Sequence, residues 1–290
     1  SRAGSINGIL GFIPTDRFSP SLRGKKSTIW QTTWMVLRSD ETKGLGVQML
    51  RYLLDSRAHS WTGTCGLNHG TRKIYERMGY TTGEIHQWYM FNPELQSRKL
   101  AVTPTRIPSV SVSSGADFQI IEAIDFLSAT DGFELEQHDA VPYKTRAQFN
   151  ARYALHPYYN YRFCLLKKAQ HATVLVTRLC THEGSAALRV VDFLGDPAPL
   201  ALGGHAIVKM LRDTGAEYAD FYCSGLAAEL EAAGMRRVAD VNGLIVPSHF
   251  EAFEQRNVVL LYALHGPGKN IVVCKGDGDQ DRPNLLGASS

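Results

Sequence analysis

Apolar residues in the first hundred positions follow two alternating patterns. Stretches rich in β-branched and aromatic residues, which are typical of strands, cover residues 5–14, 28–37, 61–67 and 85–91. Between them, apolar residues recur at the spacing of one helix face. This spacing predicts a helix that begins near Gly44 and a second that follows Asn68 and ends at Gly79. The two faces consist of Leu45, Met49, Leu50, Leu53 and Leu54, and of Thr71, Ile74, Tyr75 and Met78.

The second part of the chain repeats this order. Predicted strands at 161–168, 173–180 and 187–194 precede a predicted helix at 200–212, a strand at 218–223 and a helix at 226–233. The distance from Ser224 to Gly234 nearly matches the distance from Asn68 to Gly79. Matched order and spacing predict an internal duplication. Two unrelated α/β domains are the alternative.

Residues 98–115 contain Pro104, Pro108 and several Ser and Thr residues, without helical periodicity. This composition predicts a linker. We therefore expect an α/β fold of the α+β kind with a mixed sheet. The expected domains are residues 1–97, and residues 116–290 with a polar C-terminal tail.

Composition and charge narrow the function classes. Hydrophobic residues are 44% and charged residues 20% of the 290 residues, which fits two globular domains rather than a disordered chain. The net charge is only +3 and the basic residues are scattered, so we expect no nucleic-acid partner. The five cysteines are widely spaced and predict neither a disulfide framework nor a metal site. Without a long apolar run or a signal peptide, we expect a cytoplasmic protein that binds no membrane.

The segment from Leu37 to Gly46 places a polar loop and two glycines between a predicted strand and an amphipathic helix. The first amides of a helix have no partners within the helix, and the helix dipole makes this end positive. Glycines allow ligand oxygens to approach the backbone closely. Gly44 and Gly46 therefore predict a pyrophosphate site at the start of this helix.

The run KGLGVQMLRYLL, followed by Asn68 and then by IYERMGY, resembles the signature of the GNAT (GCN5-related N-acetyltransferase) superfamily. The similarity covers residues 5–92, and over residues 118–264 it extends only to the order of the elements. The resemblance implies a tandem double-GNAT protein whose first copy uses acetyl-CoA or another acyl-CoA as co-substrate. It also implies that this copy lacks the N-terminal strand and helices of the family's fold.

The resemblance implies roles for the matching residues. Tyr75 would protonate the departing thiolate as a general acid, because a phenol and a thiol have similar acidity. A core aromatic is the alternative for Tyr75. The glycine loop would hold the pyrophosphate, and the strand before it would pair with the pantetheine arm. The implied CoA-binding residues are Val36, Leu37, Lys43, Gly44, Leu45, Gly46, Val47 and Asn68.

The general base and one loop position are less well defined. Glu41 stands where the family has Gln or Arg, and a carboxylate there would repel a pyrophosphate. Lys43 is expected to supply the missing positive charge. His86, on a late strand, is our candidate for the general base because its ordinary pKa suits proton removal near neutrality. Asp40 and Glu41 are the alternatives.

The second copy lacks the glycine signature. Gly203 and Gly204 fall inside a predicted helix, and Pro197 and Pro199 contribute no amide donors. We therefore expect this copy to be degenerate and to shape an acceptor site. The residues assigned to substrate binding are Trp30, Arg162, Asp277, Asp279 and Arg282. A solvated tail and a calcium loop are the alternatives for the three tail residues.

The leading hypothesis is transfer of an acyl group from acyl-CoA to a primary amine. The acceptor favoured by the resemblance is an amino sugar, free or nucleotide-linked, in polysaccharide biosynthesis. A catalytically silent acyl-CoA-binding or scaffold protein is one alternative. A peptidyl-type transferase that uses aminoacyl-tRNA is the other. The sequence does not decide the oligomeric state, and an oligomer remains open.

Overall fold

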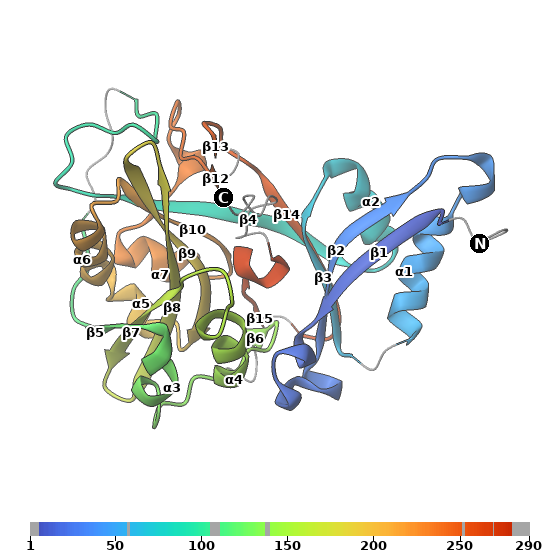
Figure 1. Ribbon diagram of the computed structural model, residues 1–290, viewed down its shortest axis with the longest axis horizontal. Helices are drawn as coiled ribbons and strands as arrows, with labels where there is room; N and C mark the ends of the chain where they lie inside the picture. The colour runs from blue at the N-terminus through green and yellow to red at the C-terminus, as the bar shows by residue number, and fades with distance from the viewer. Residues whose placement is uncertain are drawn as a thin grey trace.

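The computed structural model describes residues 6–56, 59–104, 111–136, 140–250, 253–268 and 270–279. Its strands form one mixed sheet in the order β1-β2-β3-β14-β4-β10-β9-β8-β7-β5, with β11 beside β4 and β16 beside β10. Helices flank this sheet, so the expected mixed α/β class is confirmed (Figure 1). No helix in the described residues is both long enough and apolar enough to cross a bilayer.

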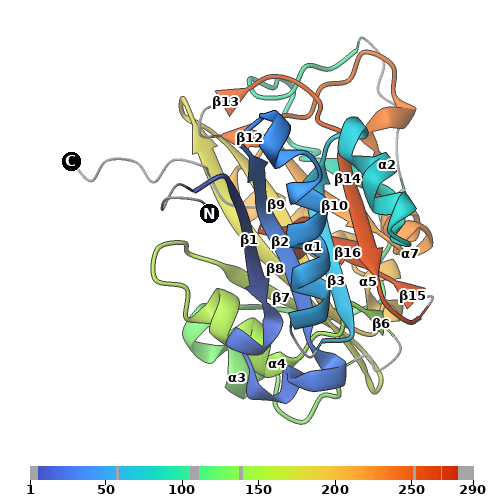
Figure 2. The same ribbon diagram turned by 90° about the vertical axis from the view of Figure 1, so that its right-hand side faces the viewer.

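The elements of the first half correspond to the sequence pattern. Its strands are β1 (Gly8–Pro14), β2 (Thr28–Val36), β3 (Trp61–Leu67) and β4 (Thr81–Phe91), and its helices are α1 (Leu45–Ser56) and α2 (His69–Arg77). Both helices lie on one face of the sheet, with α1 against β1 and β2 and α2 against β4 and β14 (Figure 2). There Leu50 of α1 and Tyr75 of α2 pack with Tyr80 and Ala263 in one buried cluster. The apolar helix faces read from the sequence are therefore the faces that pack.

The second half has a similar order. Its principal strands are β5 (Asp117–Ile121), β7 (Arg162–Lys168), β8 (His171–His182), β9 (Ser185–Gly195), β10 (Tyr218–Ser224) and β14 (Leu260–His265). Its helices are α3 (Phe126–Ala129), α4 (Arg146–Phe149), α5 (Ala198–Ala201), α6 (Gly204–Thr214) and α7 (Ala227–Ala233). The short strands are β6 (Ala140–Val141), β11 (Arg236–Arg237), β12 (His249–Phe250), β13 (Phe253–Glu254), β15 (Asn270–Ile271) and β16 (Val273–Cys274).

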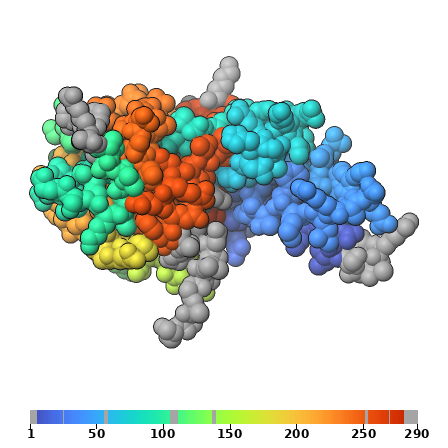
Figure 3. Space-filling model, turned by 90° about the horizontal axis from the view of Figure 1, so that it is seen from above, coloured from blue at the N-terminus to red at the C-terminus, as the bar shows by residue number. Residues whose placement is uncertain are grey.

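The two halves exchange strands. Strand β14 comes from the end of the chain but lies between β3 and β4 of the first half. Strand β4 pairs with β14 over Thr81–Ile85 and then with β10 over His86–Phe91, so it runs across both halves (Figure 1). In the space-filling view, the orange C-terminal residues lie between the green and blue parts of the chain (Figure 3). The expected division at residues 98–115 therefore does not divide the sheet.

The expected linker is packed where the structure describes it. Leu100 and Ala101 are buried, and the backbone amides of Lys99, Leu100 and Ala101 donate to the carboxylate of Glu217. The predicted helix at 200–212 is interrupted, and α6 begins at Gly204. The glycine pair of the second half thus stands at a helix start, contrary to our expectation, because the chain turns at Leu202 and Gly203 before it resumes a helix.

In the main sheet, each half contains one pair of parallel strands, and the two strands of each pair separate along their length. Strands β2 and β3 pair from Thr28 and Trp61 to Gln31 and Thr64, and no pairing continues beyond these two residues. Strands β9 and β10 pair in the same way as far as Val190 and Phe221. We call the separated ends of β2 and β3 the first fork, and those of β9 and β10 the second fork.

Candidate functional site

A β-bulge marks the base of the first fork. Gly11 of β1 lies opposite two residues of β2, Thr32 and Thr33, and the register shifts there by one residue. A Cβ on Gly11 would lie 2.8 Å from Thr32 Oγ1, so glycine allows the strands to approach at this point. A bulge redirects the side chains that follow it. The strand therefore changes its exposed faces immediately after Gln31, where pairing with β3 ends.

The bulge places Trp34 and Trp30 on opposite faces of the sheet. In a regular strand two residues four positions apart share a face. Here Trp30 is 1% exposed in the core between the halves, whereas Trp34 contacts the ring of Tyr75 on the helix side. Trp30 therefore offers no surface to a substrate, and its assigned role in substrate binding is not supported by its position.

The start of α1 presents free backbone donors. Gly44 has a φ of +78°, which favours glycine, and its carbonyl accepts the first helical hydrogen bond from Gln48. The amides of Leu45, Gly46 and Val47 have no hydrogen-bond partner within the described part of the chain. Unpartnered amides together with the helix dipole favour an anion at this position. The structure thus has the feature that the glycine motif predicts.

Trp34 adds a further donor that the sequence analysis missed. Its indole Nε1 is buried without a hydrogen-bond partner among the described residues. A Cβ added to Gly46 would lie 3.0 Å from this nitrogen, so the indole lies directly against the first turn of α1. No motif signalled this residue, because its position depends on the bulge. A buried donor without a partner costs free energy, which a ligand oxygen would recover.

The charged residues of the glycine loop largely compensate one another. Lys43 Nζ lies 2.8 Å from Asp40 Oδ1 on the surface, and Glu41 is exposed beside them. The ammonium group of Lys43, which we expected to attract the pyrophosphate, is therefore paired with Asp40. Val36 ends β2 next to this loop, and the amide of Leu37, the following residue, donates to the carbonyl of Asn7. The backbone donors of α1, rather than Lys43, are the main attraction for an anion.

At the base of the fork, Tyr75 forms part of a buried hydrogen-bond chain. Tyr75 Oη donates to Gln31 Oε1 at 2.6 Å, and Gln31 Nε2 donates to Tyr80 Oη at 3.2 Å. Burial, with Tyr80 close by, raises the pKa of Tyr75 well above that of a free phenol. Burial likewise raises the pKa of Tyr80 to about 12. Tyr75 is therefore fully protonated at neutral pH, but it is a weaker acid than an exposed phenol.

Asn68 lies at the other side of the fork, at the start of α2. Its Oδ1 accepts a hydrogen bond from the Thr71 amide at 2.9 Å, which confirms the N-cap expected from the sequence. The residue is exposed. Its side-chain amide nitrogen is the group that would face a ligand arm. Its role toward a ligand stays a prediction.

The remaining assigned residues do not gather around this fork. His86 Nδ1 lies 3.3 Å from Glu84 Oε1 on β4, and Arg162 is paired with Glu122 at the surface of the second half. Asp277 is 3% exposed within an ion-pair network, and Asp279 accepts from Arg152. Arg282 lies outside the described residues. The described part of the expected polar tail is packed, and it does not form a solvated loop.

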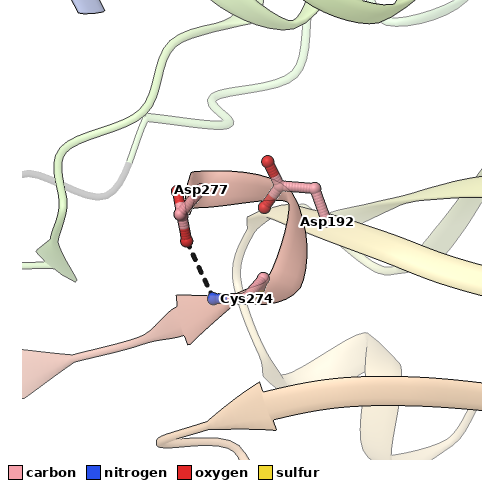
Figure 4. Close-up of side chains that lie close together, drawn as sticks. All are labelled: Asp192, Cys274 and Asp277. Carbon is pink, nitrogen blue, oxygen red and sulfur yellow. Dashed lines mark hydrogen bonds between the residues drawn. The ribbon is translucent and has the colours of Figure 1, made fainter. Parts of the chain in front are cut away.

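The second fork is filled by the chain itself. Strand β16 pairs with β10, and the 3-10 turn at Lys275–Gly278, which we call the C-terminal turn, contacts β9 and β10. Lys144 Nζ lies 2.6 Å from Asp192 Oδ1 and 2.9 Å from Asp277 Oδ2, and all three side chains are buried. Figure 4 shows both carboxylates beside Cys274, whose amide donates to Asp277. The network therefore connects the end of the chain to the second half.

Electrostatics explains why this network is closed to other cations. Burial alone would lower the pKa of Lys144, but the two carboxylates hold it above its ordinary value. Burial raises the pKa of Asp277 to about 6, although Lys144 opposes this shift. Atoms of Asp192, Cys274 and Asp277 lie close enough to ligate a metal. The ammonium group of Lys144 already supplies the positive charge there, so the residues do not fit a metal site.

The helix start of the second half also has its donors satisfied. The Gly204 amide donates to Ser113 Oγ at 3.1 Å, and the His205 amide donates to the Ser113 carbonyl at 2.9 Å. A Cβ on Gly204 would lie 1.9 Å from the carbonyl oxygen of Ala233. This glycine therefore serves the packing of α6 against the end of α7, and not the approach of a ligand.

The sequence matches no protein-family model, and no curated protein matches it. The structure is similar to solved GCN5-related N-acetyltransferases from Anabaena variabilis (10% identity, TM-score 0.44, 88% of this chain and 58% of that chain) and from Sphaerobacter thermophilus (11%, 0.42, 92% and 79%). It is also similar to a functionally unknown conserved protein from Staphylococcus epidermidis (10%, 0.41, 91% and 92%). The function proposed below rests on the site itself.

Proposed function

We propose that the chain is an acyl-CoA-dependent N-acyltransferase of the GNAT type, with its active site in the first fork. One observation carries the proposal. A single strand, β2, connects the free donors at the start of α1 with the protonated hydroxyl of Tyr75 at the base of the fork. The six residue steps from Leu37 to Gln31 span about 20 Å. An extended acyl-CoA arm can lie along such a strand.

The pyrophosphate end of the site consists of backbone and indole donors. The amides of Leu45, Gly46 and Val47 would bind the pyrophosphate oxygens, and Trp34 Nε1 would donate to the same group. Beyond Gln31, strand β2 has no pairing with β3, so its backbone is open to an extended ligand on that side. Asn68 would donate to the arm from the start of α2.

The chemical end of the site is Tyr75. Acetyl-CoA supplies the acyl group as a thioester, and transfer to an amine releases a thiol. Tyr75 would give its proton to the departing sulfur, which its raised pKa allows because the phenol is protonated at neutral pH. The base that accepts the proton of the attacking amine is a proposal from the sequence alone, His86, because this residue lies on β4 opposite β10 and away from the first fork. Its contact with Glu84 would orient the imidazole ring.

The acceptor we propose is the primary amine of an amino sugar, as the resemblance in the sequence suggests. This choice of acceptor rests on the sequence pattern alone. In the structure, Arg162 lies away from the fork, and the tail aspartates lie within ion pairs. A panel of primary amines, with release of the CoA thiol as readout, tests it. Binding of acetyl-CoA without turnover of any amine would favour the catalytically silent alternative.

Binding itself is tested with a matched pair of glycines. Gly44 and Gly132 have φ values of +78° and +79°, and neither would place a Cβ against another atom. Replacing either with alanine should cost about 1–2 kcal/mol of stability, because alanine disfavours this conformation. Acetyl-CoA should stabilise the wild type and Gly132→Ala by mass action. Gly44→Ala should bind about tenfold more weakly, because its methyl group projects where the ligand approaches.

Isothermal titration calorimetry on the three proteins decides the location of the site. Equal affinity in Gly44→Ala and Gly132→Ala would move the site away from the start of α1. No binding to the wild type at millimolar acetyl-CoA would contradict the proposed function as a whole.

A further inference from the structure

The side-chain amide of Gln31 joins the two buried tyrosines at the base of the first fork. It accepts a hydrogen bond from Tyr75 and donates one to Tyr80. Gln31 is 2% exposed, and its backbone carbonyl accepts a hydrogen bond from Thr64 Oγ1, which holds the strand at the last paired position. One buried amide therefore accepts the proton of Tyr75 and donates to Tyr80, and the Thr64 side chain also reaches the Tyr75 hydroxyl, where it lowers the pKa of the phenol.

In this arrangement the proton of Tyr75 is committed to the amide oxygen. Rotation by about 180° about the last torsion of Gln31 exchanges oxygen and nitrogen with little change of shape, and such terminal torsions are soft. The amide nitrogen would then donate to Tyr75 Oη. Tyr80, whose hydroxyl hydrogen can rotate, would donate to the amide oxygen. The same three side chains thus form two hydrogen-bond chains of opposite polarity.

We propose that Gln31 is a positioning residue that reverses this chain and thereby releases the proton of Tyr75. The inference rests on the proposed function. During transfer the O–H bond of Tyr75 breaks as the S–H bond of the leaving thiol forms. The phenolate accepts a charge-assisted hydrogen bond from Gln31 Nε2, which is stronger than the neutral bond it replaces. The proton lost by the attacking amine then restores the phenol through solvent.

A titration that needs no enzymatic activity distinguishes the reversible chain from a fixed one. If the amide only accepts from Tyr75, it stabilises the phenol, and Gln31→Met should lower the pKa of Tyr75. If the amide also donates to the phenolate, Gln31→Met removes that donor and should raise the pKa further. Methionine has a similar shape and no strong hydrogen-bonding group.

The titration uses protein in which every tyrosine is replaced by 3-fluorotyrosine, followed by fluorine NMR. Fluorination makes phenols more acidic and so lowers the pH range of the titration. Tyr75→Phe identifies the resonance by its loss. A raised pKa in Gln31→Met supports the proposal, and a lowered or unchanged pKa overturns it. Circular dichroism and thermal unfolding establish that each variant is folded.

Turnover gives the second readout. With the wild type active, Gln31→Met should lower kcat by about 10–100-fold, less than the full contribution of a general acid, with KM for acetyl-CoA changed less than about twofold. Tyr80→Phe should have a smaller effect of the same kind, and Tyr52→Phe on the exposed surface should have none. A change in KM alone would assign Gln31 to binding and overturn its positioning role. An inactive wild type would contradict the proposed function, while the fluorine titration would still decide the role of Gln31.

Discussion

The two strand forks have similar topology and differ in what meets the separated strands. At the first, the amides that begin α1 and the indole of Trp34 have no partners within the described residues. At the second, Ser113 satisfies the amides that begin α6, and β16 pairs with β10 beyond the stretch in which β10 pairs with β9. The space between two parallel strands that separate can hold a ligand or another segment of the same chain. The first fork has donors available for a ligand, whereas the second uses its own chain.

The two forks share a topology and differ in the donors available to a ligand, so we locate the candidate site by the donors and not by the topology. Both helix starts carry a glycine pair, and both follow a strand that has separated from its neighbour. Only at the first does the backbone remain unsatisfied. The comparison predicts one acyl-CoA site per chain, with the second half serving to close the sheet through β4 and β14.

The largest effect should come from the buried network that fills the second fork. Lys144→Met removes the only cation within hydrogen-bond distance of Asp192 and Asp277 among the contacts of the described residues. Two buried carboxylates without compensation should cost about 3–5 kcal/mol of unfolding free energy. Urea denaturation at pH 7 measures it. Lys209→Met breaks an exposed pair with Asp213 and should cost less than about 1 kcal/mol.

This loss should depend on pH in a defined direction. The folded-state pKa of Asp277 is raised to about 6, above its value in the unfolded chain, so stability from the protonated group is lost as the pH rises through that range. In Lys144→Met, which lacks the opposing positive charge, the pKa of Asp277 should rise further. The destabilisation caused by Lys144→Met should therefore be small near pH 4 and should grow as the pH rises through and beyond the wild-type pKa of Asp277. A difference that grows toward acid would show that the network is not held by this ion pair.

The second prediction concerns the first fork. Tyr75→Phe keeps the ring against Trp34 and Tyr80 but removes the hydroxyl group. If Tyr75 is the acid, kcat should fall by about 10²–10³-fold while acetyl-CoA binding survives. Because burial raises its pKa, the wild type should show no loss of kcat from Tyr75 up to about pH 10. Wild-type turnover by the Phe variant would leave Tyr75 as a core aromatic only.

Local patterns predicted the elements of the first half well. The apolar spacing gave α1 and α2, Asn68 proved to be the N-cap of α2, and Gly79 follows that helix with a φ of +83°. These features depend on residues that are near one another in the sequence. The glycine motif likewise predicted free amides at the start of α1, because that feature needs only a strand, a turn and a helix in succession.

Features that depend on distant pairing were not predictable. The placement of β14 between β3 and β4 joins residues nearly two hundred positions apart, and no local pattern encodes it. The bulge at Thr32 and Thr33 depends on the register with β1, so the side of Trp34 could not be read from β2 alone. Asp277 was assigned to substrate binding, with a solvated tail as an alternative, because its partner Lys144 lies far away in the sequence and no local pattern indicates their ion pair.

The third prediction compares the glycines at the two helix starts. Gly204→Ala would force a methyl group against the carbonyl of Ala233 and should cost about 1–3 kcal/mol or more. Gly46→Ala meets only the edge of the Trp34 indole, and its higher helix propensity offsets part of the contact. Its stability should change by less than about 1 kcal/mol, whereas acetyl-CoA affinity should fall. Urea denaturation of both variants measures the loss of packing, and calorimetry measures the loss of acetyl-CoA affinity. A loss of stability in Gly46→Ala together with a loss of affinity in Gly204→Ala would contradict the difference between the two helix starts.

The smallest effect should come from Glu41, which is exposed in the glycine loop. Its carboxylate repels a pyrophosphate at the start of α1, and Lys43 offsets little of this because it is paired with Asp40. A repulsion of about 0.5 kcal/mol is reasonable for charges several ångströms apart in water. Glu41→Gln should therefore tighten acetyl-CoA binding about two- to threefold, and the gain should shrink at 0.5 M salt because mobile ions screen exposed charges. Asp117→Asn, on β5 at the opposite edge of the sheet, removes the same charge and should leave the affinity unchanged. Equal tightening in both variants would show that net charge, and not the loop at the first fork, governs the approach of the ligand.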